Sequence, residues 1–463
     1  MFDLPQPVLA ICETLKAHGH QAFVVGGAVR DLLMERDPHD YDVATNAKPE
    51  AVLAAFPHTY ATGLKHGTVT VHAGEMDIEV TTFRADQGCA DGRHPDEVVF
   101  VDNIEQDLAR RDFTINAIAL DPLTGTLVDP FMGEAAIRAK LILAVGDPDQ
   151  RFIEDGLRCL RAVRFSVTLG FNIAEATKAV IPAHLDVLRK VSMERIRDEL
   201  CKMLVGPEPA RGFRTMVECF MLEAVGLPEI IPLIGQQQNR WHLWDVFEHT
   251  MAVLNLVPPV LPLRWAALLH DVGKPKTAVQ ATAQDTFMGS TRAWDGNGPE
   301  FRFFDHDTVS AEMADEMLQR LKFSNEDRER IVLLVREHMG GFALAAHQTG
   351  PAIRRFIKRV GKDNLDPLFD LFQADALGTG TRVKPFDDDL VPLRKLVDEE
   401  VARPPVNTKN PSGLAIDGKA VMEARGLKPG PEVGRIVKAL MERVLDDPAL
   451  NTVETLTALA REV

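Results

Sequence analysis

The sequence predicts an α+β protein, in which a small α/β head is followed by an all-α neck, body and tail. Short runs with the two-residue alternation of strands are frequent up to Ala144 and nearly vanish after it. The segments beyond Ala144 show the 3.6-residue period of helices instead. A chain of 463 residues is also too long for one ordinary hydrophobic core, so we expect several domains.

The head is expected to alternate strands with short helices. One strand runs into a glycine turn at AFVVGG (22–27), and two later strands, TVTVHAG (68–74) and MDIEVTTF (76–83), form a hairpin through Gly74 and Glu75. Between them we predict a helix, a strand and a second helix, at VRDLLME (29–35), DYDVAT (40–45) and KPEAVLAAFP (48–57).

The rest of the chain is predicted to be helical. Helical runs lie at 151–170, 192–204 and 211–226, and a longer helical block extends from about 242 to 378. A proline- and asparagine-rich linker, ARPPVNTKNPSG (402–413), precedes the final helices. We place the domains at 1–140 (head), 141–230 (neck), 231–400 (body) and 401–463 (tail).

Composition and charge indicate a globular, cytoplasmic protein. The chain is 45% hydrophobic and 26% charged, has no apolar run long enough for a membrane span, and begins without a signal-peptide pattern. Its five cysteines form no CxxC pair, which favours a reducing compartment. The net charge of −16 disfavours general binding to nucleic acid, but residues 138–214 hold 14 Lys and Arg against 10 Asp and Glu. Contacts with nucleic acid should concentrate there.

A glycine turn and a pair of carboxylates follow one another in the head. Gly26 and Gly27 would let backbone N–H groups approach a phosphate, and Arg30 lies one turn into the next helix. Asp40 and Asp42 face one side of the predicted strand, where their charges need a cation such as Mg²⁺. The next strand offers a third carboxylate, for which we choose Glu79 over Asp77. This set suits in-line phosphoryl transfer with two metal ions.

The neck carries a predicted helix with both acidic and basic residues, EDGLRCLRAVR (154–164). Asp155 and Arg158 are three residues apart and are therefore expected on one helix face. An aspartate accepts from an exocyclic amine and an arginine donates to ring or carbonyl acceptors, so the pair could read the edge of a cytosine or adenine. Arg161 and Arg164 continue along the helix toward possible phosphates, although an ordinary surface helix with salt bridges remains an alternative.

Taken in order, the motifs resemble those of a known family. GGAVRDLLM…HDYDVAT is similar to the head of polymerase-β-type nucleotidyltransferases, specifically the class II tRNA CCA-adding enzymes and their poly(A) polymerase relatives. RRDFTINAIA (110–119), EDGLRCLRAVRF (154–165), VSMERIRDELCKML (191–204) and the tail from Gly413 resemble the later motifs of this family.

The resemblance implies a reaction and roles for several residues. The expected reaction adds C, C and A from CTP and ATP to the tRNA acceptor end, with Mg²⁺ held by Asp40 and Asp42. Arg111 and Asp112 would lie at the ribose and phosphates, and Asp155 with Arg158 would act as a protein template for the base. Asn116 is expected to be a buried structural hydrogen-bonding group. No feature of the sequence specifies an oligomeric state.

The body carries a second set of chemically reactive residues. The order of histidines and aspartates resembles the HD superfamily of metal-dependent phosphohydrolases, and imidazole with carboxylate ligands suits a transition metal. A metal there would activate water for hydrolysis of phosphatase or 2′,3′-cyclic phosphodiester substrates, although a domain kept for its packing is an alternative. The candidate ligands are His249, His270, Asp271, His306, His338 and Asp375.

Alternatives to a complete CCA-adding enzyme remain at this point. The polar stretch from Arg84 to Asp96, with Arg84, Asp91 and Arg93, looks like the full-length loop that this family needs for the final A. This disfavours an enzyme that adds only CC, and the lack of an arginine-rich stretch after the neck disfavours a poly(A) polymerase. The other interpretations are an enzyme that adds only A, a metallophosphohydrolase with a degenerate head, and a non-catalytic RNA-binding protein.

Overall fold

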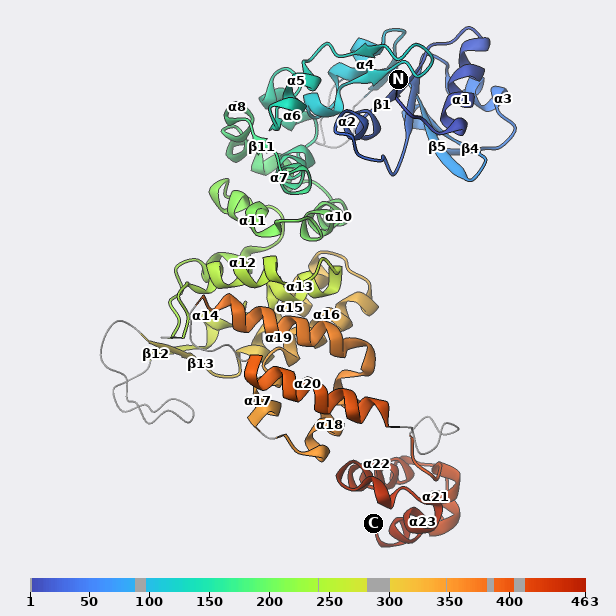
Figure 1. Cartoon of the computed structure of the whole chain (residues 1–463). Helices are drawn as coiled ribbons and strands as arrows, with labels where there is room; N and C mark the ends of the chain where they lie inside the picture. The colour runs from blue at the N-terminus through green and yellow to red at the C-terminus, as the bar shows by residue number, and fades with distance from the viewer. Residues whose placement is uncertain are drawn as a thin grey trace. The chain divides into compact units, whose positions relative to one another are not determined.

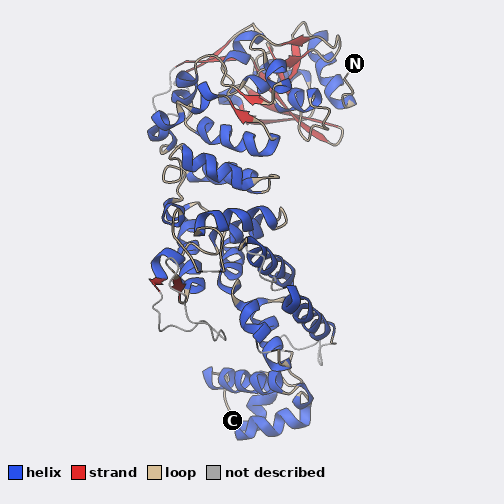
Figure 2. Ribbon diagram, turned by 60° about the vertical axis from the view of Figure 1, so that its left-hand side comes forward, coloured by secondary structure: helices blue, strands red, loops and turns tan. Residues whose placement is uncertain are grey.

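The computed structural model describes residues 2–87, 97–239, 241–280, 300–346, 348–380, 387–403 and 413–463. The chain divides into two compact units. The first comprises Met1–Ile231 with Gln319–Lys322, and the second comprises Pro232–Leu318 with Phe323–Val463. The α+β class is confirmed, because the strands of the first unit precede a helical remainder (Figure 2). The division into four domains stays a prediction within these two units.

The head is built on a seven-stranded mixed sheet. Its strand order is β3-β4-β5-β2-β1-β8-β9, and β2 with β5 is a parallel pair within otherwise antiparallel neighbours. The strands of this sheet are β1 (Ala22–Val25), β2 (Asp42–Thr45), β3 (Thr59–Gly63), β4 (Thr68–Ala73), β5 (Met76–Thr82), β8 (Ala119–Leu120) and β9 (Leu127–Val128). A separate two-stranded sheet joins β6 (Arg84–Gln87) and β7 (Glu97–Phe100).

The predicted hairpin is confirmed. β4 and β5 pair antiparallel from Thr68↔Thr81 to Ala73↔Met76, so Gly74 and Glu75 form its two-residue turn. Gly74 has φ +66°, a left-handed conformation that glycine adopts without steric cost. Along β5 the side chains alternate between exposed and buried, as expected for a strand with one solvated face.

Short helices pack around the head sheet (Figure 1). In α1 the buried residues Val8, Ile11, Cys12 and Leu15 follow the helical spacing and form one apolar face. The head helices are α1 (Gln6–Ala17), α2 (Gly27–Leu33), α3 (Pro49–Ala55), α4 (Ile104–Ala109) and α5 (Gly133–Arg138).

The neck is helical, with two differences from the predicted pattern. The run 151–170 is interrupted after Glu154, and the run 211–226 ends at Glu218, after which Phe220 adopts a left-handed φ of 57°. The neck elements are β10 (Leu141–Ile142), α6 (Pro148–Glu154), α7 (Leu157–Leu169), β11 (Asn172–Ile173), α8 (Glu175–Lys178), α9 (Leu185–Leu188), α10 (Met193–Leu204) and α11 (Pro209–Glu218).

The second unit is almost wholly helical in its described residues. Within it, Figure 1 draws β12 and β13 as a small hairpin beside the helices. The body elements are α12 (Val246–Leu256), α13 (Leu261–Leu269), α14 (Lys274–Thr277), β12 (Ala278–Gln280), β13 (Phe301–Phe303), α15 (His306–Arg320), α16 (Asn325–Glu337), α17 (Gly340–Ala346), α18 (Gly350–Val360), α19 (Leu365–Gly378) and α20 (Asp387–Ala402).

The tail forms a small core of its own. Leu414, Ile416, Val421, Leu440 and Leu456 are among its buried residues. The predicted linker 402–413 lies mostly outside the described residues. The tail helices are α21 (Gly418–Arg425), α22 (Pro431–Asp446) and α23 (Val453–Glu462). Among the described residues, no helix combines the length and apolar character that a membrane crossing requires.

Candidate functional site

The parallel pairing of β2 and β5 brings two head carboxylates together. Asp42 is the first residue of β2, and its partner in the ladder is Glu79 in the middle of β5. Both side chains are exposed. Asp77 lies two residues before Glu79 on the same face, where its carboxylate contacts His72 Nδ1 at 2.7 Å. The register therefore places Glu79, rather than Asp77, beside Asp42.

Asp40 does not lie in a strand, which corrects the prediction for 40–45. β2 starts at Asp42 because β1 ends opposite it at Val25, and Gly26 then turns away. The alternation of exposure nevertheless continues, since Asp40 and Asp42 are exposed and Tyr41 between them is buried. Both aspartates can thus serve one site, although only Asp42 is held by the sheet.

The electrostatics of Asp42 reflect this crowding of negative charge. Partial desolvation raises the pKa of its carboxyl above the usual range, Arg111 opposes this, and the charges of Glu79 and Asp40 raise the pKa further. An added cation would relieve the repulsion among the three carboxylates. Carboxylate oxygens in this number, open to solvent and substrate, are the donor set that Mg²⁺ prefers.

The glycine turn lies directly against these groups. Gly26 has φ +74°, and a Cβ added there would be 3.0 Å from Arg111 Nη1 and 3.6 Å from Asp42 Oδ2. A Cβ on Gly27 would lie 3.6 Å from Arg30 Nη2. The turn therefore leaves room between two arginines and a carboxylate, and the structure brings together Gly26, Gly27, Arg30, Asp42 and Arg111.

Arg30 and Asp112 belong to a network of polar side chains. Arg30 Nη1 donates to Asn116 Oδ1 at 2.8 Å, and Asn116 Nδ2 donates to Asp112 Oδ1 at 3.0 Å. Asn116 is buried, which confirms it as a structural hydrogen-bonding group. Asp112 also accepts from Arg161 Nε and Nη2 at 2.8 and 2.6 Å.

The network extends into the neck through α10. Arg164 Nε donates to Glu199 at 2.8 Å, and Arg161 lies 3.6 Å from the same carboxylate. The guanidinium groups of Arg30, Arg161 and Arg164 all lie over the ring of Phe165, at 5.3, 5.3 and 3.5 Å. In this structure Arg161 and Arg164 therefore contact buried carboxylates, and their contacts with phosphates stay a prediction.

Asp155 and Arg158 do not share one helix, which corrects the geometry predicted for them. Asp155 has extended backbone angles between α6 and α7, and its carboxylate accepts from Leu157 N at 3.1 Å. The helix breaks there because Gly156 packs against the chain at Val187, where a Cβ would lie 2.5 Å from the Val187 carbonyl carbon. The two side chains are nonetheless only three residues apart.

Each member of this pair is held by a further charged residue. Arg195 of α10 donates to both oxygens of Asp155, at 3.2 and 2.7 Å. Arg158 donates to Glu154 Oε2 at 2.9 Å and to the Arg110 carbonyl at 2.8 Å. The sequence pointed to Arg195, which lies in the helical motif 191–204. It did not indicate that Arg195 would pair with Asp155, 40 residues earlier.

The loop predicted from Arg84 to Asp96 lies largely outside the described residues, and with it Asp91 and Arg93. Arg84 itself is the first residue of β6. It donates to the His66 carbonyl at 2.5 Å, and its backbone N–H donates to the buried Asp107 at 3.3 Å.

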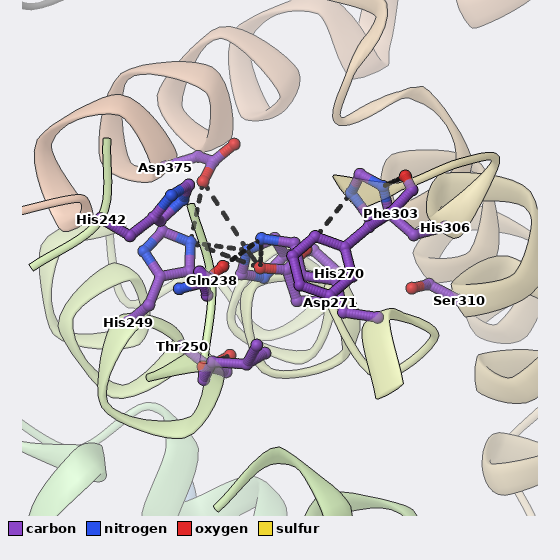
Figure 3. A network of polar contacts seen from close by, with 12 residues as sticks. Gln238, His242, His249, Thr250, His270, Asp271, Phe303, His306, Ser310 and Asp375 are labelled. Atoms are coloured by element: carbon purple, nitrogen blue, oxygen red, sulfur yellow. Dashed lines mark hydrogen bonds and ion pairs between the residues drawn. The ribbon is translucent and has the colours of Figure 1, made fainter. Parts of the chain in front are cut away.

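In the body, all six predicted ligands converge, and Figure 3 labels all of them except His338. His249, His270 and Asp375 form one group of potential metal ligands, and Asp271, His306 and His338 form another. Figure 3 shows His270 and Asp271 in the middle, with His249 and Asp375 on one side and His306 on the other. All six are buried.

The two groups meet at Asp271. Its Oδ2 lies 3.1 Å from His270 Nε2 and 3.4 Å from His249 Nε2, whereas its Oδ1 lies 3.4 Å from His306 Nε2 and 3.8 Å from His338 Nε2. Both oxygens are buried, and neither makes a hydrogen bond of good geometry, although Oδ2 forms an ion pair with Lys274 Nζ at 2.7 Å. One carboxylate oxygen is thus available to each group, as expected of a ligand shared by two cations.

Backbone carbonyls orient three of the histidines. Nδ1 of His270, His306 and His338 lies 2.8, 2.9 and 2.6 Å from the carbonyls of Ala267, Phe303 and Val335. These contacts place the proton on Nδ1 and leave Nε2 directed at the site, which is the arrangement that metal-binding histidines adopt. The residues present therefore fit divalent metal ions with imidazole and carboxylate ligands.

Burial and charge set the protonation of these groups. Burial lowers the pKa of His338 to about 3, with help from His306 and His270, so its imidazole is neutral and able to bind a metal. Burial opposes ionisation of Asp271, but His270 and Lys274 hold its pKa well below the ordinary value. Two negative charges, of Asp271 and Asp375, remain among the imidazoles.

Three residues that the sequence analysis did not single out complete this site. Lys274 Nζ lies 2.7 Å from Asp271 Oδ2 and donates to Gln238 Oε1 at 2.7 Å. The ring of His242 packs edge-on against that of His249, with centroids 5.0 Å apart. Lys274 could have been predicted as a partner of Asp271, because it follows that aspartate by three residues after an apolar helical run.

A cavity of about 610 Å³ opens beside both groups of ligands. Asp271, His306, His338 and Asp375 form part of its wall. Its volume falls within the roughly 300–1,000 Å³ typical of small-molecule sites.

Three family models match consecutive parts of the chain. The model of the poly A polymerase head domain matches residues 22–143, and that of a probable RNA and SrmB-binding site of polymerase A matches 170–233. The model of the HD domain matches residues 246–380.

Several relatives are CCA-adding enzymes. The chain is 33% identical to that of Lactobacillus delbrueckii subsp. bulgaricus over 453 residues, which cover 98% of this chain and 96% of the relative. It is 45% identical to the Lactobacillus helveticus enzyme over 51% of this chain and 60% of that one, so this alignment spans less than two thirds of the relative.

Solved structures of such enzymes share the fold. The Bacillus stearothermophilus CCA-adding enzyme in complex with CTP is 31% identical, with a TM-score of 0.71 over 99% of this chain and 96% of that chain. The Thermotoga maritima CCA-adding enzyme complexed with tRNA has a TM-score of 0.58 at 18% identity, covering 98% and 94%.

Proposed function

Because the chain belongs to the CCA-adding enzymes, we propose that it adds C, C and A to the 3′ end of tRNA, using CTP and ATP. The observation that carries this proposal is the meeting of Asp42, Glu79, Gly26 and Arg111 in the head. The tRNA 3′-hydroxyl loses its proton, its oxygen bonds to the α-phosphorus, and pyrophosphate leaves. We place this reaction in the cytoplasm.

The family implies dependence on a divalent metal, and we assign Mg²⁺ to Asp40 and Asp42, with Glu79 as the third carboxylate. When bound, the metal would supply positive charge near the ionising hydroxyl and the triphosphate. Because Gly26 and Gly27 have no side chains, the triphosphate can approach Arg111. Arg30 lies beside Gly27. Asp112 acts indirectly, because its hydrogen bonds hold the side chains of Asn116 and Arg161 in place.

Asp155 and Arg158 are proposed to read the incoming base from the neck. The amine of cytosine or adenine requires an acceptor, and a ring nitrogen or carbonyl requires a donor. The helical tail is proposed to hold the acceptor arm by shape and phosphate contacts, so that binding weakens with salt.

The test is nucleotide incorporation on three tRNA transcripts, ending at the discriminator base, at C and at CC. We expect two C residues, then one A, and then no further addition. Long A tails would instead support a poly(A) polymerase, and arrest at CC would support a partial enzyme. No incorporation on any transcript would refute nucleotidyl transfer.

Arg195 is expected to control base selection through Asp155. Arg195→Lys keeps the charge but loses the fork that grips both carboxylate oxygens. We expect the ratio of kcat/KM for CTP to that for UTP to fall by about 10-fold, since a misplaced acceptor costs discrimination. Arg197→Lys is the matched control, because Arg197 lies in the same helix and pairs with its neighbour Asp198. An equal loss for both nucleotides would mean that Arg195 has only a structural role.

We also propose a second activity, metal-dependent hydrolysis of phosphate esters in the body. The two buried groups that share Asp271 favour it. Water would supply the new oxygen on phosphorus and the proton of the released alcohol. A divalent transition metal, when bound, would lower the pKa of that water.

Metal content tests this site without depending on activity. We expect Asp271→Ala to lower the bound Mn²⁺ or Ni²⁺ at both groups, and His306→Ala to lower it at one group only, because one oxygen of Asp271 lies toward each group. The bound metal would be measured by mass spectrometry after desalting. His72→Ala, at an exposed histidine of the head, serves as the control. Equal metal content in all variants would exclude these ligands.

A further inference from the structure

One buried carboxylate of the head has no part in the proposed transfer reaction so far. Asp107 lies in α4 and is 1% exposed. Burial opposes ionisation of its carboxyl, but the neighbouring Arg110 and Arg111 hold the pKa below the ordinary value. A charge inside a protein is costly unless it is paired, so the partners of Asp107 indicate what this charge does.

The two oxygens of Asp107 have different partners. Oδ1 accepts three hydrogen bonds, from Nε and Nη2 of Arg110 at 3.0 and 2.9 Å and from the backbone N–H of Arg84 at 3.3 Å. Oδ2 accepts from Nη2 of Arg111 at 3.4 Å. Because three donors hold Oδ1, the orientation of the carboxylate is fixed, and Oδ2 stays directed at Arg111.

Arg111 connects Asp107 with the glycine turn. Its Nη1 is 3.0 Å from the position that a Cβ on Gly26 would take, and Asp42 Oδ2 is 3.6 Å from the same position. Its Nε is buried and has no hydrogen-bond partner among the described residues. A guanidinium has five N–H donors, so Arg111 retains donors for phosphate oxygens after its Nη2 has bonded to Asp107.

The position of Arg111 matters because a second carboxylate is near. Arg111 favours the ionised form of Asp42, so the two side chains attract each other, and Asp42 is one of the carboxylates assigned to Mg²⁺. A direct ion pair between them would take a donor from the triphosphate and a ligand from the metal. The hydrogen bond to Asp107 opposes this pairing, since it holds one nitrogen of the guanidinium at α4.

We propose that Asp107 is a positioning residue for nucleotide transfer, which holds Arg111 at the glycine turn for the triphosphate and keeps it from pairing with Asp42. The proposal rests on the nucleotidyl transfer proposed above and adds a buried residue that acts on the nucleotide through Arg111. Because Arg111 would contact phosphates and not the base, loss of Asp107 weakens CTP and ATP binding to the same extent. This differs from Arg195, for which we expect a changed ratio between two bases.

Asp107→Asn tests the proposal with little change in shape. The asparagine keeps an oxygen for Arg110 and the backbone N–H, but it turns an NH₂ group toward Arg111, where two donors then face each other. Equilibrium dialysis of CTP and of ATP against the full-length protein measures binding without turnover. We expect both dissociation constants to rise by about 10-fold, as for a lost hydrogen bond to a charged group. Asp121→Asn is the matched control, because Asp121 is a head aspartate that also accepts from a cation, Lys16, and from a backbone N–H.

A double-mutant cycle separates positioning from a general defect. In an Arg111→Met background, Asp107→Asn should cause no further loss of CTP affinity, whereas a structural defect would weaken binding in both backgrounds. Asp107→Glu, which keeps the charge but displaces the carboxylate, is the second variant and should show the same dependence on Arg111. Unchanged CTP affinity in the variants, or an equal loss in both backgrounds, would overturn the role of Asp107 alone. No binding of CTP to the wild type would overturn the nucleotide site itself and this role with it.

Discussion

Asp42→Asn will lower the rate of nucleotide addition by about 10²–10³-fold or more, as expected when a charged group that organises a transition state is lost. Asp42 is held at the start of β2, opposite Glu79, and lies next to Arg111 across the glycine turn. An amide keeps the shape of the side chain but removes the charge that would hold Mg²⁺. The measurement is single-turnover incorporation of CTP into a tRNA transcript without its CCA end.

The same substitution should not destabilise the fold. Desolvation and neighbouring carboxylates raise the pKa of Asp42 above its ordinary value, so ionisation of this carboxyl costs more free energy in the folded state than in the unfolded state. Removing that charge relieves repulsion with Glu79 and Asp40, and we expect an unchanged or higher Tm. Asp77→Asn, two residues from Glu79 on the same strand face, is the control and should retain activity. Activity of Asp42→Asn above a tenth of the wild-type value would refute the role of Asp42.

Asp42 and Glu79 illustrate what could be predicted from the sequence. The alternation within each predicted strand indicated which residues share a face. The structure confirms the strand that begins at Met76, whereas the other begins at Asp42 rather than at Asp40. The parallel register that sets Asp42 opposite Glu79 could not be predicted, because it depends on the whole order of the sheet. The six histidines and aspartates of the body were easier to predict, because their order along the chain resembles that of the HD superfamily.

The neck shows why local spacing was insufficient. The pattern around Asp155 is compatible with a continuous helix, but the close approach of Gly156 to Val187 breaks it. Likewise, the arginines of α7 recur every three residues, as on a helix that faces solvent. Arg161 nevertheless donates to Asp112, which lies 49 residues earlier in the chain. In both places a partner distant in sequence decides the local arrangement.

Loss of Arg161 gives the second large expected effect, which is a loss of stability. Arg161→Met should lower the free energy of unfolding by about 3–5 kcal/mol, because it leaves the buried carboxylate of Asp112 without its cation, whereas Glu199 keeps Arg164. Urea denaturation at neutral pH measures the change. Arg138→Met is the matched control, since Arg138 is largely exposed and pairs with Glu134 at the surface, where an ion pair contributes about 0–1 kcal/mol. A loss below about 1 kcal/mol for Arg161→Met would contradict the assignment.

The pH dependence separates an unpaired charge from a packing defect. In the wild type, burial opposes ionisation of Asp112, but Arg161 and Asn116 hold its pKa below the ordinary value. Its contribution is therefore complete above about pH 4, the unfolded pKa, and is lost as the pH falls below that. Without Arg161, burial raises the pKa of Asp112 in the folded state, so protonation relieves the variant as the pH falls from 7 toward 4. The deficit of Arg161→Met should thus shrink over this range, whereas a cavity left by poor packing would give a deficit that does not change with pH.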